Sequence, residues 1–307
     1  MHRHLTRLAR WWDRFLFHSC SPGTCVVLRI GYAILLLICT YSWWLDGPFW
    51  FSNEGVMSPQ TARALTGGRT WSLLGAIDAS PAVVQVGLSA LLAHGLALLL
   101  GIGSRFQALM IFLWLVTFHH RNPLILDGQD TLFRLFAFYL MWMPLDARWS
   151  VGRWWFSGTV TDDPDQLRPA AWGLRLLQMQ MVWLYISAAW SKLLGEPWRD
   201  GTALFYVAQM GDLYGRGWWP ELLLRNEMIL RYGTWAVVLA EAILPLLLMV
   251  RRTRGVGVAV GILLHLSMEY SMHLFLFQWM MILGLLSFLN FDRLVFGTAR
   301  LTCFASR

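Results

Sequence analysis

The sequence has few charged residues and a single lysine. Charged residues make up 14% of the 307 residues, whereas hydrophobic residues make up 57%. Because soluble domains carry about 25% charged residues, this composition excludes a soluble globular fold and a disordered chain. The four cysteines are too few for a small secreted module held together by disulfides. The composition therefore indicates a polytopic membrane protein, and the 19 tryptophans agree with this because tryptophan gathers at membrane interfaces.

The sequence also lacks the common motifs of several enzyme classes. It contains no G-x-S-x-G, no H-E-x-x-H, no P-loop and no dinucleotide-binding G-x-G-x-x-G. These absences argue against a hydrolase, an ATP-driven pump and a Rossmann oxidoreductase. The net charge of +7 comes from short arginine clusters between apolar runs, which is typical of cytoplasmic loops and not of a nucleic-acid-binding face.

Eight apolar stretches have about the length that is needed to cross the hydrocarbon core of a bilayer. They are 24–45, 81–102, 104–121, 129–145, 169–194, 231–250, 255–273 and 274–291. Two of these stretches are short and the last two are poorly separated, so a count of seven or nine is also compatible with the pattern. We expect an all-α polytopic membrane protein, a bundle of about eight transmembrane helices.

The distribution of arginine predicts how the chain is oriented and divided. Residues 1–20 form a cytoplasmic amphipathic arm, an interfacial helix with a basic stripe and an apolar stripe. Residues 21–295 form the transmembrane domain, and residues 296–307 form a cytoplasmic tail. The positive-inside rule then places both termini in the cytoplasm and the loops 46–80, 122–128 and 195–230 outside. We expect a multi-pass protein of the bacterial inner membrane.

One face of the fifth stretch carries polar side chains at helical spacing. Exposing these polar side chains to lipid would cost several kcal/mol, so this face lines either a water-filled cavity or a hydrogen-bonded interface between helices. Both interpretations stay open on this pattern. The stripe consists of Arg175, Gln178, Val182, Tyr185, Ala189 and Lys192.

Lys192 is the only lysine among 25 basic residues. Arginine stays protonated in proteins, whereas a buried lysine can lose its proton and act as a base or a nucleophile. A position that required only a cation would be served by arginine, as everywhere else in this chain. We therefore interpret Lys192, at the outer end of its stretch, as the candidate catalytic residue. The alternative is that a single lysine occurs at this position by chance.

Further titratable groups occur within the other apolar stretches. Glu241 lies in the sixth stretch, and His265, Glu269 and His273 follow i, i+4, i+8 spacing in the seventh. We expect a proton relay or a cavity lining from them and no metal site, because three ligands from one straight helix rarely converge on one ion. In the fourth stretch we expect Asp130 and Arg134, four residues apart, to form a structural ion pair that meets the same cavity.

Several segments together resemble the HTTM (horizontally transferred transmembrane) domain proteins, which are related to the membrane part of vitamin K-dependent gamma-carboxylase. The segments are LRIGYAILL at 28–36, HHRNPLILDGQDTLFRL at 119–135, LLQMQMVWLYISAAWSKLLGEPWRDGTALFY at 176–206, and RRTR at 251–254 with His265 beyond it. The third is the most specific, because a lysine follows an aromatic-rich helix and precedes W-x-D-G. In the carboxylase, a lysine at the corresponding helix end deprotonates reduced vitamin K, so the resemblance implies that Lys192 is the matching base.

Two functions follow, and the sequence leaves open whether the protein is an enzyme. In the first, Lys192 is the general base of a membrane enzyme that acts on a quinol-like or peptide substrate at the outer face. The enzyme would be either a carboxylase-like carbon–carbon lyase or a quinol-dependent oxygenating enzyme. A reduced quinone is the expected cofactor, with no metal and no nucleotide, and the partners are the lipid bilayer and a peptide or small protein, with no nucleic acid. In the second, the protein is a non-catalytic maturation, immunity or export partner that binds a peptide in an outward-facing cavity. The expected supporting residues are Tyr185, Arg175, Gln178, Glu241, His265, Asp130, Arg134, Trp198 and Asp200.

The predicted topology can be tested directly with reporter fusions. Fusions at residues 160 and 253 should report the cytoplasmic side, and fusions at residues 60 and 212 should report the outer side. A cytoplasmic report at residue 212 would place the Lys192 end of the fifth stretch inside, and an outward-facing site there would be abandoned.

Overall fold

The fold is known from a computed structural model in which every regular element of the described residues is a helix. The chain forms two compact units, which are described here in turn: residues 1–176 with 290–307, and residues 177–289. The structure describes residues 10, 12, 13, 15–17, 20–68, 71–157, 171–211 and 226–296.

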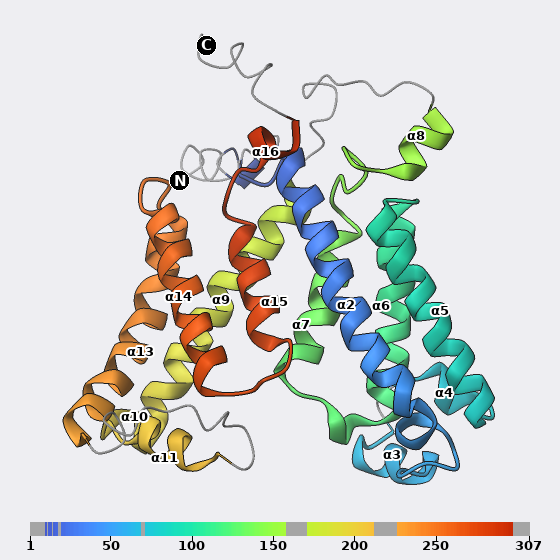
Figure 1. Cartoon of the computed structure of the whole chain (residues 1–307), viewed down its shortest axis with the longest axis horizontal. Helices are drawn as coiled ribbons and strands as arrows, with labels where there is room; N and C mark the ends of the chain where they lie inside the picture. Colours follow the sequence, from blue (N-terminus) through green and yellow to red (C-terminus); the bar gives the residue numbers. More distant parts are fainter. Residues whose placement is uncertain are drawn as a thin grey trace, which may run out of the picture. The chain divides into compact units, whose positions relative to one another are not determined.

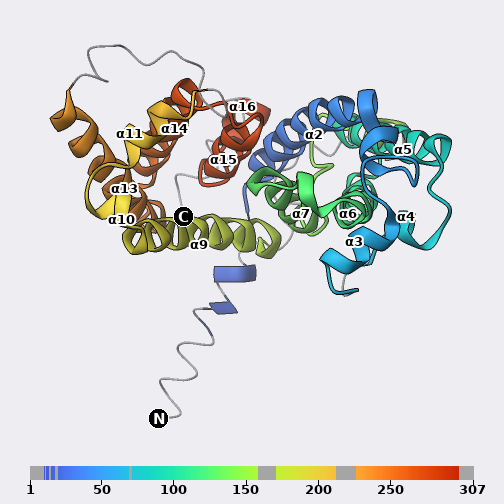
Figure 2. The ribbon, with the colours of Figure 1, turned by 90° about the horizontal axis from the view of Figure 1, so that it is seen from below.

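The first unit is built on four helices that pack in sequence order around a buried core. Helix α2 packs on α5, α5 on α6, and α6 on α7 (Figures 1 and 2). Short helices lie at the ends of these four, with α3 and α4 against α6 and α16 against α2. The bounds are α2 Pro22–Phe51, α3 Pro59–Leu65, α4 Leu73–Ala76, α5 Pro81–Leu100, α6 Ser104–Arg121, η1 Pro123–Ile125, α7 Gly128–Leu140, α8 Val151–Ser157 and α16 Asp292–Phe296.

Local sequence signals set where the helices of the first unit begin. The Ser21 hydroxyl accepts the Thr24 N–H at 3.2 Å, and proline follows directly at the first helical position, where its missing N–H costs nothing. At the start of α7, the Asp127 and Asp130 carboxylates form a reciprocal capping box. Burial and the neighbouring Asp130 raise the pKa of the Asp127 carboxyl. These caps fix the helix starts before any tertiary contact is considered.

Arg29 ties α2 to the segment that follows α7. Its side chain is fully buried and donates to the carbonyl oxygens of Leu145 at 2.9 Å and of Trp149. The Asp146 carboxylate lies 3.8 Å from the same guanidinium. Gly101 has a φ of +73°, and a Cβ there would lie 2.5 Å from the Arg29 Nη1 atom, so the glycine leaves room for the guanidinium. The arginine therefore works as a tether between helices.

The two predicted outer loops of the first unit meet at one end of it. The Arg121 guanidinium, at the end of α6, donates to the Ser52 carbonyl oxygen at 2.7 Å. The next residue, Asn122, donates from Nδ2 to the carbonyl of Trp50 at 3.0 Å. The loops 46–80 and 122–128 thus lie on the same end of the first unit, as a topology with alternating helices requires.

The second unit is built from the main part of α9 and from α13, α14 and α15, with α10 and α11 lying against α13 (Figures 1 and 2). Small residues allow two of these helices to approach closely, because a Cβ at Gly261 of α14 would lie 2.7 Å from the Leu285 side chain of α15. The bounds are α9 Trp172–Leu194, α10 Glu196–Arg199, α11 Ala203–Gln209, α13 Glu227–Met249, α14 Arg254–Ser271 and α15 Phe277–Leu286.

Each of the eight expected apolar stretches contains one principal helix, but the helices differ in length from the expectation. Within the described residues, three are long and apolar enough to cross a membrane, namely α2, α5 and α13. At 1.5 Å per residue, the 13 residues of α7 and the 10 of α15 reach only about 20 Å and 15 Å, short of the roughly 30 Å hydrocarbon core. The count of eight spans stays a prediction, and most of the expected N-terminal arm lies outside the described residues.

The Arg29 tether predicts a specific loss of stability. Arg29→Met keeps the length of the side chain but leaves the carbonyls of Leu145 and Trp149 without their donors, so we expect a loss of about 2–4 kcal/mol. Thermal unfolding of the purified protein in detergent measures this effect. The exposed Arg252 supplies the matched control, since Arg252→Met should change stability by no more than about 0.5 kcal/mol. Equal midpoints for the two variants would show that Arg29 is not a tether.

Candidate functional site

Lys192 and Glu241 form an ion pair in the second unit. The Lys192 ammonium, in the last turn of α9, lies 2.9 Å from Oε1 and 2.7 Å from Oε2 of the Glu241 carboxylate on α13. The lysine side chain is 19% exposed and the glutamate side chain 7%. A carboxylate from another helix thus supplies the counter-charge that a cation at such a depth needs.

The backbone around Glu241 is unusual. Pro245 lies inside α13, four residues after Glu241. Because proline has no N–H, the Glu241 backbone carbonyl loses its ordinary helical donor. The residue that pairs with Lys192 thus lies in a turn of α13 that lacks one ordinary helical hydrogen bond.

Trp198 closes one side of the Lys192 ammonium. Its ring centroid lies 5.1 Å from Nζ, within the range of a cation–π interaction. Trp198 lies on the short helix α10, which is followed by Gly201 at a φ of +79°. A Cβ at Gly201 would lie 2.4 Å from the Arg231 side chain on α13, so only glycine lets the turn fit there. The W-x-D-G segment is therefore the turn that holds an indole ring against the lysine.

A series of hydrogen bonds between buried polar side chains also crosses the second unit. The Tyr185 hydroxyl of α9 lies 2.8 Å from Nε2 of His265 on α14, and Nδ1 of His265 lies 2.6 Å from Oε1 of Gln278 on α15. All three side chains are buried. Because Oε1 only accepts, Nδ1 of His265 donates to it, and in the neutral imidazole Nε2 then accepts from the tyrosine hydroxyl. Nε2 of Gln278 is buried and has no hydrogen-bond partner among the described residues.

The polar stripe of α9 does not converge on one point. Gln178 donates to the Ser287 carbonyl at 2.6 Å, which is the inter-helix seam that the sequence left as an alternative. Tyr185 meets His265, and Lys192 meets Glu241. Arg175 belongs to the first turn of α9, where its guanidinium lies 5.4 Å from the centroid of the Phe15 ring. About 25 Å of helix axis separates it from Lys192, so we assign Arg175 no part in the lysine site.

Asp130 and Arg134 belong to the first unit, and their expected ion pair does not form. Asp130 instead lies beside His119 of α6, whose Nε2 is 3.5 Å from Oδ1. Asp130 also accepts the Asp127 N–H at 2.9 Å as part of the helix cap. The cap fixes the carboxylate at the start of α7 and turns it toward α6 and away from the next turn of its own helix. That these residues meet the cavity of Lys192 stays a prediction.

The structure changes one other expectation in the second unit and leaves one untested. α14 ends at Ser271, and Met272 after it is extended, so His273 does not continue the helical face of His265 and Glu269. The backbone then turns at Phe275, which has a φ of +46°. Asp200 is exposed at the end of α10, where its N–H caps the Glu196 carbonyl, and its place at the mouth of a cavity stays a prediction.

Sequence reasoning missed two buried polar residues that the structure places beside expected ones. Gln278 bonds His265, and His119 contacts Asp130. A glutamine in an otherwise apolar stretch is a detectable signal for a buried hydrogen bond. His119 gave a weaker signal, because it stands at the end of its stretch beside His120 and Arg121, where polar residues are ordinary.

Comparison with known proteins identifies one family. The HTTM domain model matches residues 76–292, which is well over half of the chain and includes Asp130, Lys192, Glu241 and His265. A search of curated proteins gave no match, and neither did a search of solved structures.

The ion pair predicts energetic coupling between two helices. Lys192→Met or Glu241→Leu alone leaves one charge in apolar surroundings, so each should cost about 1–3 kcal/mol, whereas the double variant should cost less than the sum. Thermal unfolding of the four proteins in detergent gives the coupling free energy, which we expect to exceed about 1 kcal/mol. Additive losses would mean that the contact contributes nothing to stability.

Proposed function

The chain belongs to the HTTM domain family and is an integral membrane protein, and from this premise we propose that it is a membrane enzyme whose general base is Lys192. The proposed substrate is a quinol-like molecule or a peptide at the outer face of a bacterial inner membrane, with both termini in the cytoplasm. The reaction would resemble that of vitamin K-dependent carboxylase.

One observation carries the proposal: the only lysine of the chain is held against a buried carboxylate. The Lys192–Glu241 pair is electrically neutral whether the shared proton lies on nitrogen or on oxygen. The pair can exist as ammonium and carboxylate or as uncharged amine and carboxylic acid. In apolar surroundings the uncharged form is less disfavoured than in water, because the charged groups lose their hydration there. When the proton lies on Glu241, the Nζ lone pair is free to accept a proton from a substrate O–H. An arginine at this position could not do this, since its guanidinium does not deprotonate.

The residues around Lys192 fit a reduced quinone as the cofactor. Such a ring is flat and apolar and carries acidic hydroxyl groups, and the site supports these features with the Trp198 indole, the Lys192 amine and the Glu241 carboxylate. When bound, the reduced quinone would supply the reducing equivalents. Lys192 would take its hydroxyl proton, Glu241 would hold the amine in position, and Trp198 would cover it from water.

The Tyr185–His265–Gln278 chain supports the site from two turns deeper on α9. Its hydrogen bonds join α9, α14 and α15, and Lys192 joins α9 to α13. The orphan Nε2 of Gln278 offers a donor for a further polar group of a substrate. We assign these three side chains a positioning role, because a neutral imidazole between a hydroxyl and an amide holds its neighbours without a net charge.

The purified protein supplied with a reduced naphthoquinone and oxygen tests the proposal. Oxygen consumption above the spontaneous rate should fall at least about 100-fold in Lys192→Arg, because general-base catalysis contributes about 10²–10⁴-fold. Arg175→Lys is the matched control, an exchange between the same two residue types at the other end of the same helix, and it should keep most of the activity. Oxygen consumption that is unchanged in Lys192→Arg would refute Lys192 as the base.

The ion pair also favours a second function, a non-catalytic partner that binds a peptide in an outward-facing cavity. A carboxylate at 2.7 Å stabilises the protonated lysine, and a permanent ammonium suits the recognition of an acidic peptide better than proton abstraction. In this case Lys192 would exchange Glu241 for a carboxylate of the peptide.

The two functions predict opposite results for one variant. Without catalysis, Lys192→Arg should retain more than about half of the biological activity, since a charged donor is preserved, while Lys192→Met should lose it. With catalysis, both variants should be inactive. Survival or maturation assays on a peptide encoded beside the gene compare the two, with the membrane level of each variant measured in parallel.

A further inference from the structure

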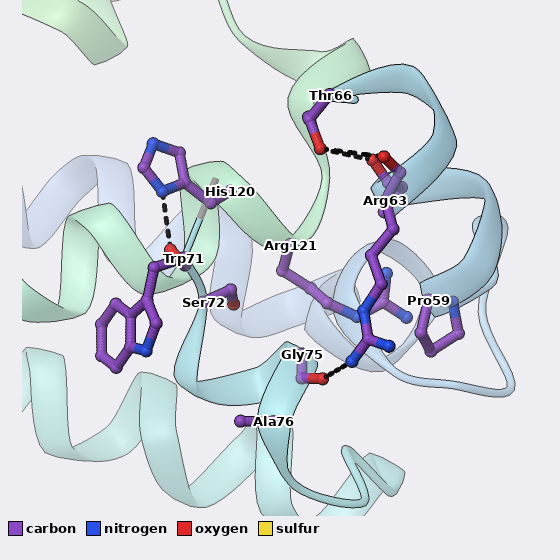
Figure 3. A pocket seen from close by; sticks show the side chains of 10 residues that line it. Pro59, Arg63, Thr66, Trp71, Ser72, Gly75, Ala76, His120 and Arg121 are labelled. Atoms are coloured by element: carbon purple, nitrogen blue, oxygen red, sulfur yellow. Dashed lines mark hydrogen bonds between the residues drawn. The ribbon is translucent and has the colours of Figure 1, made fainter. Parts of the chain in front are cut away.

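The first unit carries a basic pocket at the end where its two predicted outer loops meet. The pocket has a volume of about 170 Å³. Arg63, His120 and Arg121 bring two guanidinium groups and an imidazole to its wall, and none of the described residues that line it is acidic. Figure 3 shows the two arginine side chains on one side of the pocket, with His120 and Trp71 on the other.

Among the residues that the structure describes, no carboxylate neutralises either guanidinium. Arg121 is 1% exposed, and its Nη2 donates to neutral oxygens, those of Ser52 at 2.7 Å, Met57 at 2.9 Å and the Asn53 side chain at 3.5 Å. Its Nε and Nη1 are buried and have no hydrogen-bond partner within the described part of the chain. The Arg63 guanidinium donates to the Gly75 carbonyl. The buried charge of Arg121 is costly without a counter-charge, and an anion bound between it and the exposed Arg63 would offset that cost.

The Asp78 carboxylate, which is connected to Arg121 through hydrogen bonds, does not neutralise the guanidinium. Asp78 accepts from the Asn53 Nδ2 at 2.8 Å, so it reaches Arg121 only through an amide. His120 donates from Nδ1 to the Trp71 carbonyl at 2.7 Å, which fixes the ring at the pocket wall. The pocket is thus a set of donors that are held in place by the backbone around them.

An apolar groove lies on the other side of α4. Ser72, Gly75 and Ala76 line the basic pocket, whereas Leu73, Leu74 and Ile77 line the groove, which has a volume of about 270 Å³. The Ser72 hydroxyl donates to the Thr117 carbonyl at 2.7 Å, which anchors this wall to α6.

The groove runs from the helix ends toward the interior of the bilayer. It continues along Ala82, Val83, Val86 and Gly87 on α5 and Trp114 on α6, so it extends about 9 Å along the first two turns of α5. Val86 is 70% exposed. Because α2 and α5 are long and apolar enough to span, their ends lie at headgroup level and the groove descends toward the acyl chains.

We propose that this composite site binds an anionic phospholipid, with its phosphate group in the basic pocket and the start of one acyl chain in the groove. The charge of the pocket matches the headgroup, the apolar lining of the groove matches the chain, and α4 separates the two as the glycerol region separates head from tail. This site lies in the first unit and is independent of the Lys192 site, so a failure of one proposal leaves the other standing.

Native mass spectrometry of the purified full chain in detergent tests the site with two probes that share their acyl chains, phosphatidylglycerol and uncharged diacylglycerol. The protein should retain phosphatidylglycerol preferentially. Arg63→Gln, at an exposed position, should weaken its retention about tenfold. Arg252→Gln removes one charge elsewhere and should have less than a twofold effect. Equal retention of both lipids, or equal effects of the two variants, would overturn the proposal.

The tail groove needs its own variant, because the same cations would also bind free phosphate. Val86→Trp fills the groove at an exposed position and should weaken retention of phosphatidylglycerol by about the same factor as Arg63→Gln, with an unchanged unfolding midpoint. Inorganic phosphate at millimolar concentration should not displace the lipid. Displacement by phosphate that depends on Arg63 and is insensitive to Val86→Trp would identify a free-anion site and overturn the lipid assignment.

Discussion

A cation that leaves water needs oxygen atoms around it, and the arrangement of this chain depends on how three buried cations meet that need. Arg29 finds the carbonyls of the segment after α7. Arg121 finds the carbonyls of the loop after α2. Lys192 finds the Glu241 carboxylate. Each cation joins elements that are distant in sequence, so the polar contacts determine which apolar helices lie together, a choice that hydrophobic burial does not make because it is non-directional.

The sequence predicts the helices better than it predicts their contacts. Apolar length and capping residues are local, so the helix starting at Pro22 and the one starting at Pro81 follow directly from a serine–proline pair. The ends of α7 and α15 are different. Both helices stop inside apolar sequence, where hydropathy continues although the α-helix does not. After both ends the backbone continues in single hydrogen-bonded turns and no longer in α-helix, so a hydropathy pattern overestimates the length of the α-helix.

In the candidate site, too, the sequence predicts some residues but not all of their contacts. Lys192 could be found because its residue type is unique in the chain, and Glu241 because a carboxylate in an apolar stretch requires a cation. The pairing of Asp130 could not be found by spacing, because the cap of α7 already uses this carboxylate and orients it toward His119. The i, i+4 spacing gives only the opportunity for a pair, and a competing local hydrogen bond decides whether the pair forms.

The arginines and the lysine differ in whether they can lose a proton. A guanidinium keeps its charge beside carbonyl oxygens, as at Arg121, and also beside a carboxylate, as at Arg29 with Asp146 at 3.8 Å, so both arginines serve as anchors. An ammonium against a carboxylate is neutral as a pair, and its proton can pass between nitrogen and oxygen without creating charge in the apolar interior. The same physical requirement, compensation of a cation away from water, thus gives tethers at Arg29 and Arg121 and, under the proposed function, a place for proton transfer at Lys192.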